Sequence, residues 1–168
     1  MPKVTAVALP PESLLAPLYA KADFCDAWAI DLVDPNLSAL AIAHKTFAAT
    51  PPWVNGLLAL RDRIVALVGL RGAGSMKASL QKPLVDYRPG DKLGIFKIFS
   101  LTEAELILGI DDSHLDVRVS ILKPADAPGT YVTATLVQIH NRLGRLYMVP
   151  VGRVHPFIVR AMMRQTAA

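Results

Sequence analysis

Hydrophobic and polar residues alternate along the middle of the chain in the pattern of antiparallel β-strands. The clearest stretch is His114 to Lys123, where Leu115, Val117, Val119 and Ile121 alternate with polar positions and predict a strand with one dry face. Pairs of turn-forming residues separate this stretch from similar ones. The pattern predicts a meander of four strands over Lys92–Ser100, Glu105–Ile110, His114–Lys123 and Tyr131–His140.

Two helices are predicted before the meander. From Leu37 to Ala49 apolar residues recur at intervals of three and four, and Asn36 is a suitable cap for this helix. A second apolar stripe runs from Trp53 to Val68 and stops at Gly69. The prolines just before this second stripe are accepted in the first turn of a helix.

A long amphipathic helix is predicted after the meander, over Leu143 to Met163. Pro150 and Pro156 interrupt its pattern, each at a cost of about 3 kcal/mol inside a regular helix. The alternative is a hairpin through residues 141–144 that leads to a fifth strand at Arg145 to Val149.

The rest of the chain is less regular. Lys3 to Leu9 suits a short edge strand that ends at two prolines, and Phe24 to Val33 suits a second extended segment. Leu70 to Gly90 is rich in glycine and proline, and a connection of this length in a compact domain is often a lid or a binding loop.

These elements predict an α+β fold in a single domain over residues 1–168. A curved antiparallel sheet would grip the long C-terminal helix against its dry face, with two helices inserted before the main meander.

Composition favours either a large core or an apolar cavity. Hydrophobic residues make up 52% of the chain and charged residues only 19%. No window of about eighteen residues is free of charge and proline, so no integral membrane segment is expected. No signal peptide of adequate length is present, and Cys25 alone cannot form an internal disulfide. We therefore expect a soluble, cytoplasmic protein.

The net charge is +4, which weakly favours anionic partners. The arginines of the last quarter of the chain are spread out, with few aromatic residues between them. A nucleic-acid site would need a clustered basic stripe with stacking side chains, so no nucleic acid is expected as a partner.

The densest polar group in the sequence is Asp111, Asp112, His114, Asp116 and Arg118. A histidine between carboxylates suits acid–base chemistry, and an arginine suits an anionic group. The alternative is a solvated turn that runs into the wet face of a strand. Nothing in the spacing makes these side chains converge on a metal ion, so neither a metal nor another cofactor is expected.

Arg61 lies among apolar residues on the second predicted helix. A buried guanidinium needs a carboxylate partner or an anionic ligand, unless its head reaches water. The candidate ligand-contacting residues are Trp28, Arg61, His114, Asp116, Arg118 and Tyr147.

Several segments resemble the bacterial family called domain of unknown function 2867. They are Pro52–Val54, Leu60–Asp62, Gly94–Phe96, Gly109–Arg118, His140–Tyr147 and His155–Arg160. The resemblance implies a protein that occurs alone or joined to a dehydrogenase-like domain, and it supplies no catalytic residue. The order of elements also resembles the helix-grip fold of plant-allergen, lipid-transfer and polyketide-cyclase proteins, which is a likeness of architecture alone.

Three functions follow as hypotheses. The first is the binding of a small hydrophobic or lipid-like molecule in a cavity between the sheet and the C-terminal helix. The second is a cyclase- or isomerase-like enzyme that uses His114 and nearby carboxylates. The third, implied only by the family's fusions, is a non-catalytic partner of a dehydrogenase-like protein.

Overall fold

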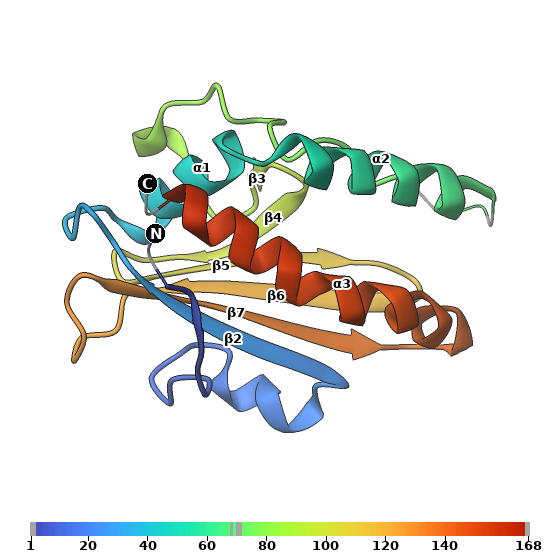
Figure 1. The fold of residues 1–168 in the computed structure, drawn as a ribbon, viewed down its shortest axis with the longest axis horizontal. Helices are drawn as coiled ribbons and strands as arrows, with labels where there is room; N and C mark the ends of the chain where they lie inside the picture. Colours follow the sequence, from blue (N-terminus) through green and yellow to red (C-terminus); the bar gives the residue numbers. More distant parts are fainter. Residues whose placement is uncertain (1–2, 68, 70–71, 167–168) are drawn as a thin grey trace.

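The computed structural model describes residues 3–67, 69 and 72–166, and one antiparallel sheet of seven strands organises them (Figure 1). The strand order is β1-β2-β7-β6-β5-β4-β3. The strands are β1 Thr5–Ala6, β2 Phe24–Asp31, β3 Lys92–Leu93, β4 Phe96–Leu101, β5 Glu105–Asp111, β6 Leu115–Leu122 and β7 Thr130–Ile139. The predicted edge strand and the second extended segment are therefore confirmed as β1 and β2.

The three predicted helices are α1 Ala39–Ala48, α2 Pro52–Leu67 and α3 Arg142–Thr166, and two short 3-10 turns are η1 Ala16–Lys21 and η2 Leu84–Asp86. The predicted cap Asn36 is wrong, because the Ser38 side chain accepts the hydrogen bond from Ala41 N. Val68, where the second helix was expected to end, lies outside the described residues.

The long C-terminal helix is confirmed, and the alternative strand at Arg145 to Val149 is wrong. Helix α3 continues through Pro150 and Pro156, so two N–H donors are missing inside it. Its packing against α1 and β2 stabilises the helix in spite of these two missing donors.

The first strand of the predicted meander is a hairpin instead of one strand. β3 and β4 pair through Leu93 and Phe96, with Gly94 in the turn between them. Gly94 has φ +61, and a Cβ built there would lie 2.7 Å from the backbone oxygen of Met76. Only glycine fits this turn without strain, and an alternation pattern does not show it.

The outer face of the sheet is drier than the alternation predicted. Ser120, expected to be solvated, is 1% exposed because the segment before β2 covers it. Glu105 accepts hydrogen bonds from Ser13 Oγ at 2.7 Å and from Ser120 Oγ at 2.6 Å. Leu15 packs beside them on the same face. A buried carboxylate thus fastens the N-terminal segment to the sheet.

The inner face carries the three helices (Figure 1). Helix α1 packs against α3, β5 and β6, and its residues Ile42 and Ala43 are fully buried in the main core. Helix α3 runs across the sheet and contacts β2. Among the described residues, helix α2 does not pack closely against any other helix or strand. The candidate site lies between α2 and the sheet.

Among the described residues, no helix combines the length and the apolar character that crossing a membrane requires.

Candidate functional site

A cavity of about 680 Å³ lies between the inner face of the sheet, α2 and α3. Its floor comes from β4, β6 and β7, including Val119 and Ile121 of β6. Its walls are mainly aliphatic side chains of the two helices, such as Leu57 and Leu58 of α2. A cavity of this size and character matches those that hold small ligands in proteins.

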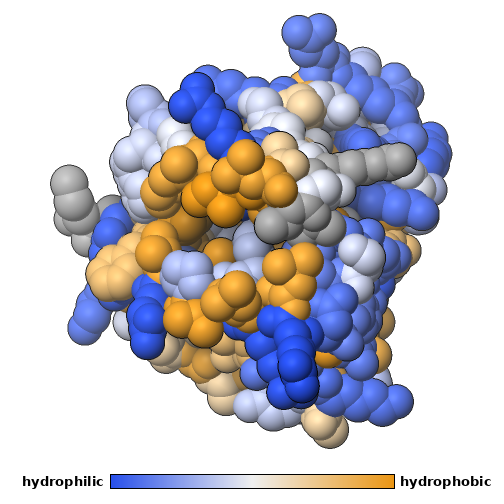
Figure 2. All heavy atoms as spheres, turned by 90° about the vertical axis from the view of Figure 1, so that its right-hand side faces the viewer, coloured by the Kyte–Doolittle hydropathy of each residue, from blue (hydrophilic) through white to orange (hydrophobic). Residues whose placement is uncertain are grey.

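The cavity opens between α2 and α3 at one end of the molecule. Four of its lining residues are at the same time half exposed or more: Leu60 (52%), Ile64 (56%), Leu146 (70%) and Val149 (52%). Figure 2 shows hydrophobic side chains on both sides of a recess at this end. Apolar side chains of both helices therefore line this mouth.

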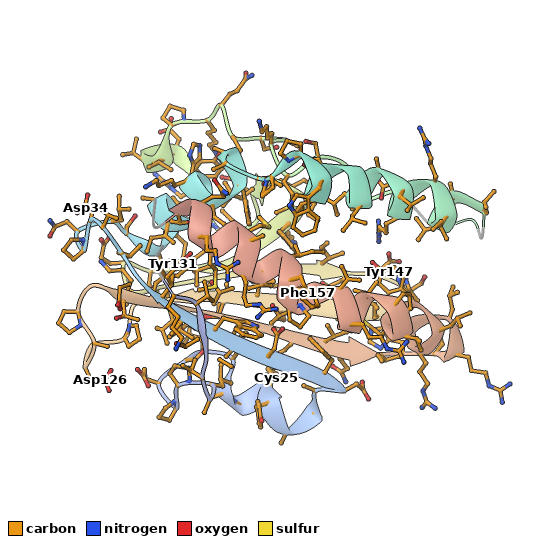
Figure 3. The ribbon with its side chains drawn as sticks, viewed as in Figure 1. Cys25, Asp34, Asp126, Tyr131, Tyr147 and Phe157 are labelled. Carbon is orange, nitrogen blue, oxygen red and sulfur yellow. The ribbon has the colours of Figure 1, made fainter. Side chains whose placement is uncertain are left out.

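Arg61 and Tyr147, two of the residues chosen from the sequence, meet at this cavity. Arg61 Nε donates a hydrogen bond to the Tyr147 hydroxyl at 3.1 Å and joins α2 to α3. Tyr147 lies on the side of α3 that faces α2 (Figure 3). In the described part of the chain this is the hydrogen bond that spans the space between the two helices.

Arg61 has the carboxylate partner that its burial demands. Its Nη1 donates to Asp62 Oδ1 at 2.9 Å, and Asp62 also accepts from the backbone N–H groups of Ala73 and Gly74. Burial alone lowers the pKa of Arg61, but the hydrogen bonds to Tyr147 and Asp62 outweigh burial and raise it. The guanidinium therefore stays charged beside Asp62, and Asp62 holds the loop after α2.

The loop that was expected to serve as a lid or binding loop contributes to the cavity. Met76 lies in this connection, is 4% exposed and lines the cavity beside α2. The hydrogen bonds that Ala73 N and Gly74 N donate to the Asp62 carboxylate hold this part of the loop against α2.

His114 lies behind the cavity wall and does not line the cavity. It is 1% exposed, in contrast to the wet position that the alternation predicted, because the first turn of α3 covers it. Its ring meets Tyr147 edge to face at 5.4 Å. Nδ1 lies 3.5 Å from Asp112 Oδ2, and within the described ranges neither ring nitrogen has a hydrogen-bond partner.

Asp116 and Arg118 lie on the outer face, around a separate hollow of about 130 Å³. Asp116 Oδ2 is 3.1 Å from His140 Nε2, and Arg118 Nη2 is 2.6 Å from Asp111 Oδ1. The structure therefore separates these two residues from the cavity.

Trp28 lies in β2, on the same face as α3, but it does not line the cavity. The Arg160 guanidinium stacks over its ring at 5.2 Å, and the indole N–H is buried without a partner in the described structure. Its surroundings are those of a packed side chain beneath α3.

The sequence interpretation missed four polar residues of the cavity: Thr46, Thr133, Thr135 and His155. Thr133 and Thr135 follow Tyr131 at intervals of two along β7, so the strand period could have placed them on the inner face. His155 lies four residues after Val151 and three before Ile158, within the apolar stripe of α3.

The sequence of the chain matches one known protein family. The model of the family described as "Protein of unknown function (DUF2867)" matches residues 18–162. The chain belongs to this family. The matched region contains the whole sheet from β2 onward and every residue named above as lining the cavity. No curated protein and no solved structure matches the chain.

Proposed function

We propose that this member of the DUF2867 family binds a small hydrophobic or lipid-like molecule in the cavity between the sheet and the C-terminal helix α3. The observation that carries the proposal is the cavity of about 680 Å³ with its mainly apolar walls. Apolar surface that leaves water contributes roughly 25 cal/mol per Å² to binding before the cost of ordering the ligand.

The arrangement of the helices supports the same function. Helix α2 exposes most of its length, and only Val54 and Val65 of its sixteen residues are buried. Leu57, Leu60 and Ile64 face the cavity instead of packing in the main core. A ligand beneath α2 would supply the contacts that other helices of this size obtain from protein.

The few polar groups of the cavity suit an amphipathic ligand. Arg61 and Tyr147 lie on the α2 and α3 walls, and Thr133, Thr135 and His155 lie farther along the cavity. A ligand with one polar group on a hydrophobic frame would satisfy one of these positions and fill the rest of the volume.

Native mass spectrometry of the full chain with 1-decanol, 2-decanone and decanoic acid tests the proposal. We expect one equivalent of at least one of these probes to bind and to raise the melting temperature. Glycerol serves as the polar control and should not bind. If none of the three apolar probes binds, or if glycerol binds equally well, the proposed function is wrong.

A further inference from the structure

His155 of α3 and Asp26 of β2 form a pair at the cavity, although 129 positions separate them in the sequence. His155 Nδ1 lies 2.9 Å from Asp26 Oδ2. The two side chains are 21% and 14% exposed, and Phe24 packs against the imidazole ring edge to face at 5.6 Å. The ring is therefore held in one orientation by a hydrogen bond on one side and an aromatic contact on another.

This pairing determines which ring nitrogen is left for a ligand. A carboxylate can only accept a hydrogen bond, so Nδ1 is protonated and donates a hydrogen bond to Asp26. Nε2 then keeps its lone pair, and in the described part of the structure no protein group donates to it. Because His155 lines the cavity, the Nε2 lone pair that this oriented ring has in its neutral form is available to the cavity's occupant.

Thr135 supplies a complementary hydrogen-bond donor. It is the cross-strand partner of Asp26 in the β2–β7 ladder, so their Cβ atoms lie about 4.5–5.5 Å apart on one face of the sheet. Thr135 lines the cavity and is 3% exposed. Its hydroxyl and Asp26 Oδ1 are both buried without a hydrogen-bond partner among the residues described. Buried polar atoms are rarely left in this state, and a ligand carbonyl could accept a hydrogen bond from the Thr135 hydroxyl.

We propose that His155, Asp26 and Thr135 form an acid–base site for an apolar molecule that carries an enolisable ketone. The inference rests on the proposed function, since the ketone is carried on a ligand of this cavity. His155 Nε2 removes a proton from the carbon beside the carbonyl. The C–H electron pair forms a carbon–carbon double bond, and the carbonyl π pair moves to oxygen, where the Thr135 hydroxyl donates a hydrogen bond.

Nε2 then gives a proton to the same carbon or to a conjugated one, and the carbonyl forms again. When the proton on Nε2 has first exchanged with water, the net result is proton exchange at the same carbon; delivery to the conjugated carbon shifts the double bond, and no co-reactant is consumed. Asp26 is a positioning residue, because it holds the tautomer and orientation of the imidazole and does not touch the ketone.

Deuterium uptake by 2-decanone in D₂O tests this site, with binding of the same probe followed separately by native mass spectrometry. We expect the wild-type protein to exchange the protons beside the carbonyl faster than buffer does. His155→Gln should slow the exchange by roughly 100-fold, the size of effect a general base supplies. His140→Gln is the matched control on the outer face, and its exchange rate should equal that of the wild type.

Two further variants separate chemistry from folding. Thr135→Val keeps the shape of the side chain, and Asp26→Asn keeps a hydrogen-bond acceptor beside the ring. Both should slow the exchange of the bound probe. Asp26→Asn, at a residue that does not touch the ketone, should keep the affinity for 2-decanone within about twofold. A merely structural role would change affinity or melting temperature and leave the rate of the bound probe unaltered.

Two outcomes overturn the inference. One is binding of 2-decanone without exchange above the buffer rate, and the other is equal exchange by wild type and His155→Gln. Failure of every apolar probe to bind would instead contradict the proposed function. The two failures are therefore distinguishable in one set of samples.

Discussion

The two helices that precede the main meander differ in how they use the same face of the sheet. At one end α1 packs directly on α3 and the sheet, and Ala39, Ile42 and Ala43 are 0% exposed. At the other end α2 lies beyond the cavity, and its lining residues Leu60 and Ile64 remain more than half exposed. One inner face thus supports a solid core and an open cavity.

Side-chain size and anchoring explain the difference. The alanines of α1 allow its backbone to approach α3. Lys45 Nζ of α1 also donates a hydrogen bond to the Thr166 backbone oxygen of α3 at 2.9 Å. Helix α2 contacts α3 by a hydrogen bond at Tyr147. The comparison indicates that the α1 end is the more tightly packed one, and the ligand proposed above would bind at the α2 end.

The largest expected effect is a loss of stability at the closed end. We expect Ile42→Ala to lower the free energy of unfolding by about 2–5 kcal/mol, because it creates a cavity in a fully packed core. Leu57→Ala should cost about 1 kcal/mol or less, since this side chain already borders empty space. Urea denaturation measures both values, and equal losses would mean that the two ends are packed alike.

The next effect concerns the start of α3, where the helix touches the β5–β6 turn. A Cβ at Gly144 would lie 2.2 Å from the His114 backbone oxygen, whereas one at Gly152 would meet nothing nearer than 3.7 Å. Gly144→Ala should cost about 1–3 kcal/mol, because the first turn of α3 must move away from the sheet. Gly152→Ala is the matched control and should stabilise the protein by roughly 0.5–1 kcal/mol. Similar melting temperatures for both variants would contradict this contact.

A smaller effect is expected from the bond between α2 and α3. Tyr147→Phe removes the acceptor of Arg61 Nε and should cost about 0.5–1.5 kcal/mol. Hydrogen exchange should then become faster in the amides of α2 and stay unchanged in those of α1. Faster exchange in both helices would show that α1 and α2 open together, and would contradict the difference in packing between the two ends.

The smallest effect is a pH dependence at Asp62. Burial raises the pKa of Asp62, but backbone hydrogen bonds from Ala73 and Gly74 and the Arg61 charge lower it below the usual 3.8. The ionised carboxylate therefore stabilises the folded state at pH above 3.8, and this contribution is lost as pH falls through the lower folded value. Asp62→Asn should be less stable than wild type at neutral pH, with the difference vanishing in strong acid. A difference that persists unchanged in acid would exclude this origin.

Much of the fold could be predicted from periodicity. The spacing of apolar residues was sufficient for α1, α2 and α3, even with Pro150 and Pro156 inside the last helix. The β3–β4 hairpin was missed because its turn depends on the backbone of Gly94 and its approach to Met76, which a local pattern does not contain.

The candidate site was less predictable, because its residues come together only in three dimensions. Arg61 and Tyr147 were chosen from the sequence and line the cavity, whereas Asp116 and Arg118 face the outer hollow. His155 pairs with an aspartate on a distant strand, and neither local sequence shows that contact. A polar residue within an apolar stripe is the signal that could have identified it.

Calorimetric titration of Val119→Phe with 1-decanol tests the central claim most directly. Val119 faces the cavity from β6, and a phenyl ring there would occupy part of the 680 Å³. Val85→Phe is the control at a site that is 78% exposed. We expect wild type and Val85→Phe to bind one equivalent equally well, and folded Val119→Phe to bind at least tenfold more weakly. Unchanged affinity in Val119→Phe would contradict a ligand site between the sheet and the helices.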